Sequence, residues 1–129
     1  MTMSLAAPVL DCLDPAPMVC FYAAACGAEV IEVDADGGYL RLGAVLLAVR
    51  RLDDYRPPSW PDPAVPVQVH LDFFVDDVAD AEHRFVQLGA TRPTHQPNRG
   101  NGLVVLLDPA GHPFCIGTRE GVREDLLDH

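Results

Sequence analysis

The sequence predicts an α+β fold built from two βαβββ modules. Three observations support this prediction. Two predicted helices have the same boundary residues, each helix follows a short apolar segment, and each is followed by further short apolar segments. A proline-rich stretch separates the two halves. The same order of elements in both halves indicates an internal repeat within a single small domain.

Each predicted helix begins at an aspartate and ends at a glycine 13 positions later. These pairs are Asp14 with Gly27 and Asp76 with Gly89. An aspartate side chain can accept hydrogen bonds from the free N–H groups of a first helical turn, and glycine readily adopts the left-handed conformation that ends a helix. In the second helix, apolar residues recur at helical spacing at Val78, Ala81, Phe85 and Leu88.

Short apolar segments separated by glycine, aspartate and proline predict eight strands. In the first half they cover residues 8–13, 29–33, 39–42 and 45–49. In the second half they cover residues 70–75, 90–95, 103–107 and 114–118. The predicted organisation is a first module at about 5–50, a semi-rigid linker at 51–66, a second module at about 67–119 and a charged tail at 120–129.

Composition excludes several classes of protein. The chain has 129 residues, of which 49% are hydrophobic, so it is long enough to bury a core. Its net charge of −10 repels phosphates, so we expect neither nucleic acid nor an anionic membrane surface as a partner. All nine basic residues are arginine, which excludes a lysine Schiff base and a Walker A loop.

The sequence predicts a cytoplasmic protein with free thiols. No apolar run approaches the ~20 residues of a membrane helix, and the first residues, MTMSLAAPVLD, do not resemble a signal peptide. No two of the four cysteines form a CxxC pair, so a zinc finger is unsupported.

Two βαβββ modules in about 130 residues resemble the vicinal oxygen chelate superfamily, which includes glyoxalase I, bleomycin-resistance proteins and extradiol dioxygenases. The resemblance is carried by HLDFFVDD at 70–77, LGA at 88–90 and LDPAGHPF at 107–114. In these details the chain is most similar to glyoxalase-like domain proteins common in actinobacteria. The resemblance implies two cupped, mostly antiparallel mixed sheets, whose cups form a ligand pocket, and a homodimer.

Metal-dependent members of the superfamily use four ligands, two from each module, on its first and last strands. Carried over to this sequence, only His70 matches. The other places hold Pro8, Cys115 and the strand 45–49, which lacks His, Asp and Glu. One residue of slack in aligning the modules would add only Asp11. We therefore expect no metal and no cofactor, although Cys115 remains open as a second ligand or as a thiol activated by His70.

The predicted ligand-binding residues are His70, Asp72, Phe74, Cys115 and Trp60. Strand alternation places His70, Asp72 and Phe74 on the pocket face and the residues between them against the helices. We expect Asp72 to pair with Arg92 or Arg41, or to lie at an exposed rim, because a buried unpaired charge is costly. Further expected pocket-lining residues are Leu106, Cys12 and Tyr39.

Structural interpretations of the same residues remain open. His70 could be a strand-end histidine bonded to a neighbour, Trp60 an anchor for the linker, and Cys115 a small apolar filler. The favoured function is a small-molecule-binding protein with a degenerate metal site, and its charge favours a cationic ligand. The alternative is a lyase or isomerase that uses His70 as metal ligand or general base. A third possibility is an interaction module without a small ligand.

Overall fold

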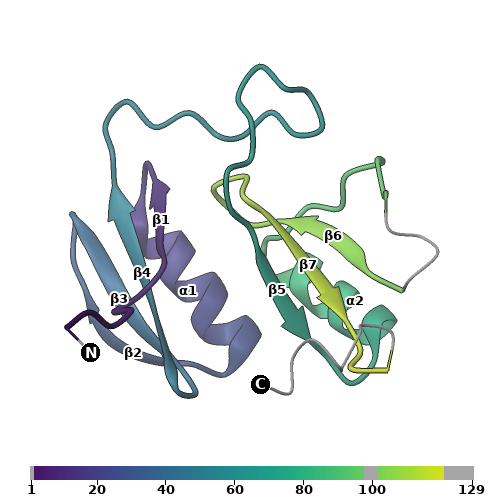
Figure 1. The fold of residues 1–129 in the computed structure, drawn as a ribbon, viewed down its shortest axis with the longest axis horizontal. Coiled ribbons are helices and arrows are strands. Elements are labelled where there is room, and N and C mark those ends of the chain that lie inside the picture. The colour runs from purple at the N-terminus through teal and green to yellow at the C-terminus, as the bar shows by residue number, and fades with distance from the viewer. Residues whose placement is uncertain (1, 98–101, 121–129) are drawn as a thin grey trace. The chain divides into compact units, whose positions relative to one another are not determined.

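The computed structural model describes residues 2–97 and 102–120, and the chain divides between Pro57 and Pro58 into two compact units (Figure 1). The first unit contains β1 (Val9–Cys12), α1 (Pro15–Cys26), β2 (Glu29–Val33), β3 (Gly37–Leu42) and β4 (Val45–Arg51). The second unit contains β5 (Leu71–Phe74), α2 (Val78–Leu88), β6 (Val104–Leu107) and β7 (Pro113–Gly117). None of the described helices is both long and apolar enough to cross a membrane.

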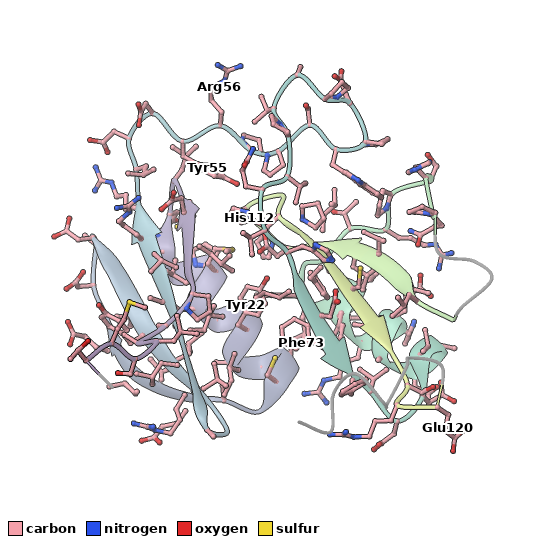
Figure 2. All side chains as sticks on the ribbon, viewed as in Figure 1. Tyr22, Tyr55, Arg56, Phe73, His112 and Glu120 are labelled. Carbon is pink, nitrogen blue, oxygen red and sulfur yellow. The ribbon has the colours of Figure 1, made fainter. Side chains whose placement is uncertain are left out.

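The first unit is a four-stranded mixed sheet with the order β1-β4-β3-β2. β1 pairs with β4 in parallel, while the other two pairings are antiparallel. Helix α1 packs on this sheet, and the buried core of the unit includes Met18 and Tyr22 of α1 with Leu40 of β3 and Leu47 of β4, each at most 1% exposed (Tyr22 is labelled in Figure 2). Burying such side chains contributes about 1.5–3 kcal/mol each, so this face forms the core of the unit.

The predicted boundaries of α1 are confirmed. The Asp14 side chain accepts a hydrogen bond from the backbone N–H of Ala16, and Pro15 occupies the first helical position, where no N–H is needed. Gly27 ends the helix at φ 61° in the left-handed region.

The N-terminus of α2 corrects a prediction by one residue. Asp77, not Asp76, is the N-cap, because its Oδ1 accepts a hydrogen bond from the backbone N–H of Asp80 at 2.9 Å. Gly89 ends the helix as predicted. Phe85 is the buried residue of the predicted apolar stripe, whereas Leu88 is 36% exposed.

The second unit has a three-stranded sheet with the order β5-β7-β6. β7 is the central strand, parallel to β5 and antiparallel to β6. The ring centroid of Phe114 lies 5.8 Å from that of Phe73 and 6.1 Å from that of Phe85 on α2. Phe73 and Phe114 therefore share the face of the sheet that packs against α2, as strand alternation predicts.

The described residues contain seven strands, and not the predicted eight. The segment 90–95 forms only an isolated bridge between Thr91 and Leu107. Pro93 lacks a backbone N–H, which disfavours further pairing there. Instead, the buried Gln96 side chain accepts a hydrogen bond from the Val105 N–H and donates one to the Val105 carbonyl, each at 2.9 Å. A side chain therefore supplies the hydrogen-bond partners of this backbone group on β6.

The predicted linker is more structured than its sequence indicates. β4 continues through Arg51. Residues 59–65 form a closed loop, since the Ser59 Oγ accepts from the Val65 N–H at 2.8 Å and the Ser59 N–H donates to the Val65 carbonyl at 2.8 Å. This loop belongs to the second unit.

Candidate functional site

A row of three side chains lies on the face of β5 opposite α2. His70 directly precedes the strand, and Asp72 and Phe74 follow at alternate positions. The side chains of His70 and Asp72 are 49% and 64% exposed, and Phe74 is 39% exposed. Because the intervening Phe73 faces the helix, the three side chains share the opposite, partly exposed face of the sheet, as strand alternation predicts.

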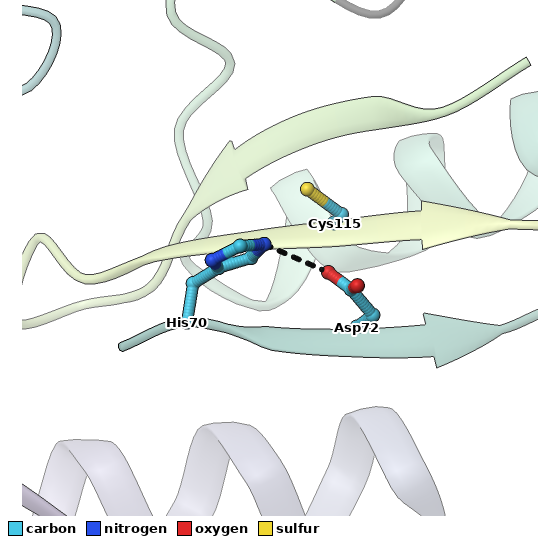
Figure 3. Close-up of side chains that lie close together, drawn as sticks. All are labelled: His70, Asp72 and Cys115. Atoms are coloured by element: carbon cyan, nitrogen blue, oxygen red, sulfur yellow. Dashed lines mark ion pairs between the residues drawn. The ribbon is translucent and has the colours of Figure 1, made fainter. Parts of the chain in front are cut away.

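Cys115 lies beside this row on the neighbouring strand. In the parallel pairing of β5 with β7, Asp72 is the register partner of Cys115 (Figure 3). The imidazole Nε2 of His70 lies 3.2 Å from the Oδ1 of Asp72. One ligand atom from each of the three residues lies within 4.8 Å of the other two. We call His70, Asp72 and Cys115 the His–Asp–Cys cluster.

The environment of Cys115 favours its protonated form. Burial raises the pKa of the thiol to about 11, and the negative charge of Asp72 and a hydrogen bond to that carboxylate add to the effect. At neutral pH the thiol therefore remains protonated and donates to Asp72. This arrangement disfavours the thiolate nucleophile that the sequence left open.

Asp72 has a different partner from the one predicted. It pairs with His70, whereas Arg92 pairs with Glu82 and Arg41 lies 4.0 Å from Glu29. The predicted arginine pairing is therefore wrong, and the alternative of an exposed position is confirmed. Solvent at the rim of the sheet hydrates this carboxylate, so it does not need a buried cationic partner.

A hollow of about 420 Å³ lies at the end of the row. Its lining residues are Phe74, Val75, Asp76, Thr118, Arg119 and Glu120. The guanidinium carbon of Arg119 lies 4.5 Å from the centroid of the Phe74 ring, and Glu120 lies beyond the end of β7 (Figure 2). A cation over an aromatic face contributes about 0.5–1 kcal/mol at an exposed site. Arg119 was missed as a site residue because it is the last residue of the predicted second module, next to the charged tail, and belongs to no motif.

Three other residues that were expected to line the pocket, Trp60, Cys12 and Leu106, lie away from the row on β5 or are buried. The Trp60 ring contacts His95 at a centroid separation of 5.2 Å, and Trp60 belongs neither to the cluster nor to the lining of the hollow. Cys12 and Leu106 are at most 1% exposed. Leu106 pairs in register with Phe114, so it lies on the α2 face and the expectation that it lines the pocket is wrong.

The first unit has a hollow of its own, of about 410 Å³. Tyr39 lines this hollow, together with several carboxylates, and none of the other expected pocket residues does. Asp11 lies 3.0 Å from the Arg50 Nε, and Asp34 accepts from the backbone N–H groups of Asp36 and Gly37. Two of these carboxylates are thus engaged in local interactions.

The glyoxalase-like domain family model matches residues 7–117. The chain belongs to this family. The fold is that of the vicinal oxygen chelate superfamily, and known structures of glyoxalase-like proteins share it. No curated protein matches the sequence significantly.

Three solved structures illustrate the shared fold. The fosfomycin resistance protein FosX from Listeria monocytogenes, complexed with Mn(II) and a dihydroxypropylphosphonic acid, is 15% identical, with 99% of this chain and 98% of that chain covered and a TM-score of 0.71. A lactoylglutathione lyase from Agrobacterium tumefaciens is 23% identical, with 89% and 92% covered and a TM-score of 0.60. A glyoxalase-related enzyme from Fulvimarina pelagi is 21% identical, with 90% and 88% covered and a TM-score of 0.65.

The residues of this glyoxalase-like chain fit one class of metal ion better than another. The cluster offers one imidazole nitrogen, one carboxylate oxygen and one sulfur. Thiolate and imidazole suit zinc and related ions, whereas magnesium, calcium and manganese prefer oxygen ligands. Asp72 lies outside the ligand places that the family resemblance implies, so it was predicted as a ligand-binding residue but not as a metal ligand.

Proposed function

We propose that this glyoxalase-like chain binds a small organic molecule over the exposed face of β5 and β7. The observation that carries the proposal is the continuous row of His70, Asp72 and Phe74 leading into a hollow of about 420 Å³. Polar groups beside an aromatic surface are the arrangement that orients a small ligand. In this proposal the metal centre of the superfamily is degenerate, because Pro8 and residues 45–49 of β4 offer no ligands.

Each residue of the row has a distinct role in the proposal. Asp72 accepts a hydrogen bond or an ion pair from the ligand, and His70 fixes the position of that carboxylate at 3.2 Å. Phe74 provides an apolar face, and Arg119 covers it at 4.5 Å. A ligand with a planar apolar body and a cationic or hydrogen-bond-donating end matches these groups.

Charge supports a cationic group on the ligand. Asp76 and Glu120 line the hollow with Arg119, and Asp72 lies on the adjoining row, so carboxylates outnumber the guanidinium. The net charge of −10 attracts cations over a longer range. Arg119 can move from Phe74 at a cost of about 0.5–1 kcal/mol, which leaves the ring free for a ligand cation.

A ligand screen on the purified protein tests the proposal. Small aromatic compounds with and without a cationic group are tested for thermal stabilisation in the presence of a chelator, because a ligand that binds only the folded state raises its melting temperature. We expect cationic aromatic compounds to stabilise the protein. Phe74→Ala should remove this effect, and Val86→Ala, which changes an α2 residue that is 44% exposed, should not. Equal stabilisation of Phe74→Ala and Val86→Ala by these compounds would contradict the proposal. A screen in which no compound stabilises the unmodified protein would also contradict it.

The alternative function is a metal-dependent or acid–base lyase or isomerase. The proximity of three ligand atoms in the His–Asp–Cys cluster favours it. In that case His70 would act as a metal ligand or as a general base. Turnover of a substrate, lost in His70→Ala while the fold is retained, would distinguish catalysis from binding alone.

The proposal includes a homodimer. β2 is an edge strand of its sheet, and its residues Val30, Ile31 and Val33 are 43–46% exposed. An exposed apolar edge strand favours association with another chain. A second copy that covers β2 would bury these side chains.

A further inference from the structure

We propose that His70, Asp72 and Cys115 bind a thiophilic divalent cation such as Zn²⁺ or Cd²⁺, with one coordination position left open. This inference goes beyond the binding of an organic ligand and does not depend on it. It rests on the placement of an imidazole, a carboxylate and a thiol side by side at one position of the second unit (Figure 3).

The distances in the cluster are close to those of a bound ion. Zinc binds nitrogen and oxygen at about 2.0–2.2 Å and sulfur at about 2.3 Å, so tetrahedral ligand atoms lie roughly 3.3–3.7 Å apart. The His70 Nε2 and Asp72 Oδ1 already lie 3.2 Å apart, and all three ligand atoms lie within 4.8 Å of one another. Side-chain rotations of about an ångström would complete the geometry.

The backbone fixes the relative positions of the donors. Asp72 and Cys115 are register partners in the parallel pairing of β5 with β7, and His70 lies two residues from Asp72. Two donors therefore come from hydrogen-bonded strands and the third from the residue directly before β5, so assembling the site requires no loop to close. Such rigid elements limit the entropy that binding must remove.

The donor types select the ion. A cysteine sulfur binds zinc and cadmium well and binds magnesium or manganese poorly. The ion displaces the proton of the Cys115 thiol to solvent, and two anionic ligands and one imidazole then balance the charge of the divalent cation. Three protein ligands with a fourth position for water or an external ligand are typical of zinc sites that are not purely structural.

Accessibility allows the ion to enter. His70 and Asp72 are about half exposed or more, while Cys115 is 5% exposed and forms the inner ligand. The net charge of −10 raises the local concentration of cations. His70 and Cys115 occupy two of the four ligand places implied by the superfamily resemblance, but Asp72 is an added donor, a cysteine stands at the last-strand place, and all three donors come from one unit.

Metal titration of the chelator-treated full chain tests the inference. Co²⁺ and Cd²⁺ are added with no organic ligand present, and the ultraviolet band of a thiolate-to-metal charge transfer is followed. We expect one equivalent per chain to produce the band, a rise in melting temperature with Zn²⁺, and no comparable rise with Mg²⁺. Cys115→Ser should abolish the band. His70→Ala and Asp72→Asn should weaken metal affinity by about tenfold or more, because replacing even a residue that only hydrogen-bonds a metal ligand lowers the affinity by about that factor.

Matched cysteine variants control for surface thiols. Cys20→Ser and Cys26→Ser, which change two exposed cysteines on α1, should leave the band unchanged. If Cys115→Ser does not fold, as judged by circular dichroism, the exposed variants His70→Ala and Asp72→Asn decide the question. The inference would be overturned if the full chain showed no charge-transfer band or if the band persisted at full strength in the cluster variants. It would also be overturned if Cys20→Ser lost as much of the band as Cys115→Ser. Phe74→Ala should retain metal binding, which separates this result from the test of the proposed function.

Discussion

Asp72 on β5 and Cys115 on β7 are direct partners in a parallel strand pairing, and the buried thiol donates a hydrogen bond to the exposed carboxylate. The carboxylate also lies 3.2 Å from the His70 imidazole, so it links a buried group to a solvent-exposed one. A ligand or ion that reaches Asp72 would therefore change the environment of both neighbours.

The reactivity of Cys115 should follow its environment. In the metal-free protein, we expect iodoacetamide to modify Cys20 at neutral pH long before it modifies Cys115, because the pKa of Cys115 is raised to about 11 and the thiol is buried. Asp72→Asn removes a negative charge and should lower this pKa, although burial, the larger cause, remains. Peptide mass spectrometry across a pH series measures both effects. Rapid labelling of Cys115 at neutral pH would contradict this prediction.

The same pKa predicts a pH dependence of stability. Folding raises the pKa of Cys115 above its ordinary value of 9.0, so the folded state holds the proton more tightly than the unfolded state. This contribution is fully present below pH 9.0 and is lost as the pH rises toward about 11. Chemical unfolding of the metal-free protein across this range should therefore show a decline that is smaller in Cys115→Ser.

The two faces of the second sheet should respond differently to the loss of an aromatic ring. Phe114→Ala removes a core residue that is 2% exposed and should cost about 3–5 kcal/mol of unfolding free energy. Phe74→Ala removes a ring that is 39% exposed and should cost clearly less, with the loss of the Arg119 contact contributing about 0.5–1 kcal/mol. Urea unfolding measures both variants, and equal losses would mean that Phe74 is a core residue.

His70→Ala should leave the fold intact and weaken ligand binding. The pair with Asp72 is exposed, and exposed ion pairs contribute about 0–1 kcal/mol. We expect a melting temperature close to that of the unmodified protein, with the loss seen only when ligand is present. A large fall in melting temperature without ligand would identify His70 as a structural histidine.

Gln96 should be important for folding in spite of its polar side chain. Gln96→Ala leaves the N–H and carbonyl of Val105 without this partner, and a buried unsatisfied group costs about 1–3 kcal/mol. Gln87→Ala, at an exposed position of α2, is the matched control and should change stability little. Hydrogen exchange at the Val105 amide should also accelerate in Gln96→Ala alone.

The oligomeric state is a separate prediction. Light scattering should give about twice the 14.0 kDa mass of the chain. Replacing the exposed β2 residue Ile31 with aspartate should shift the protein toward monomer, because a charge on an apolar contact disfavours association. A single species of 14.0 kDa at working concentration would contradict the homodimer.

Local signals in the sequence predicted most of the fold. The Asp14 cap and the glycines that end both helices act on neighbouring residues, so their chemistry is readable without a structure. Asp76 and Asp77 are two adjacent potential caps, and the choice between them depends on how β5 ends. The strand predicted at 90–95 was wrong because Pro93 lacks a backbone N–H and the side chain of Gln96 makes hydrogen bonds to Val105 of β6 in place of backbone pairing.

The site was harder to predict, because its key relationships are non-local. Alternation along β5 was enough to group His70, Asp72 and Phe74. The partnership of Asp72 with Cys115 depends on the register of two strands that are separated along the chain by helix α2 and strand β6, and one sequence does not specify that register. Arg119 carries no motif, and its position over Phe74 is visible only in three dimensions.

All three members of the His–Asp–Cys cluster lie in the second unit. Both units contain a mixed sheet with one helix, but the imidazole, carboxylate and thiol of the cluster all belong to the second unit. Mutations in the first copy can therefore accumulate without removing a donor, provided that its own packing survives. Such a division would allow one half of the protein to diverge toward a different ligand while the other half keeps its reactive groups.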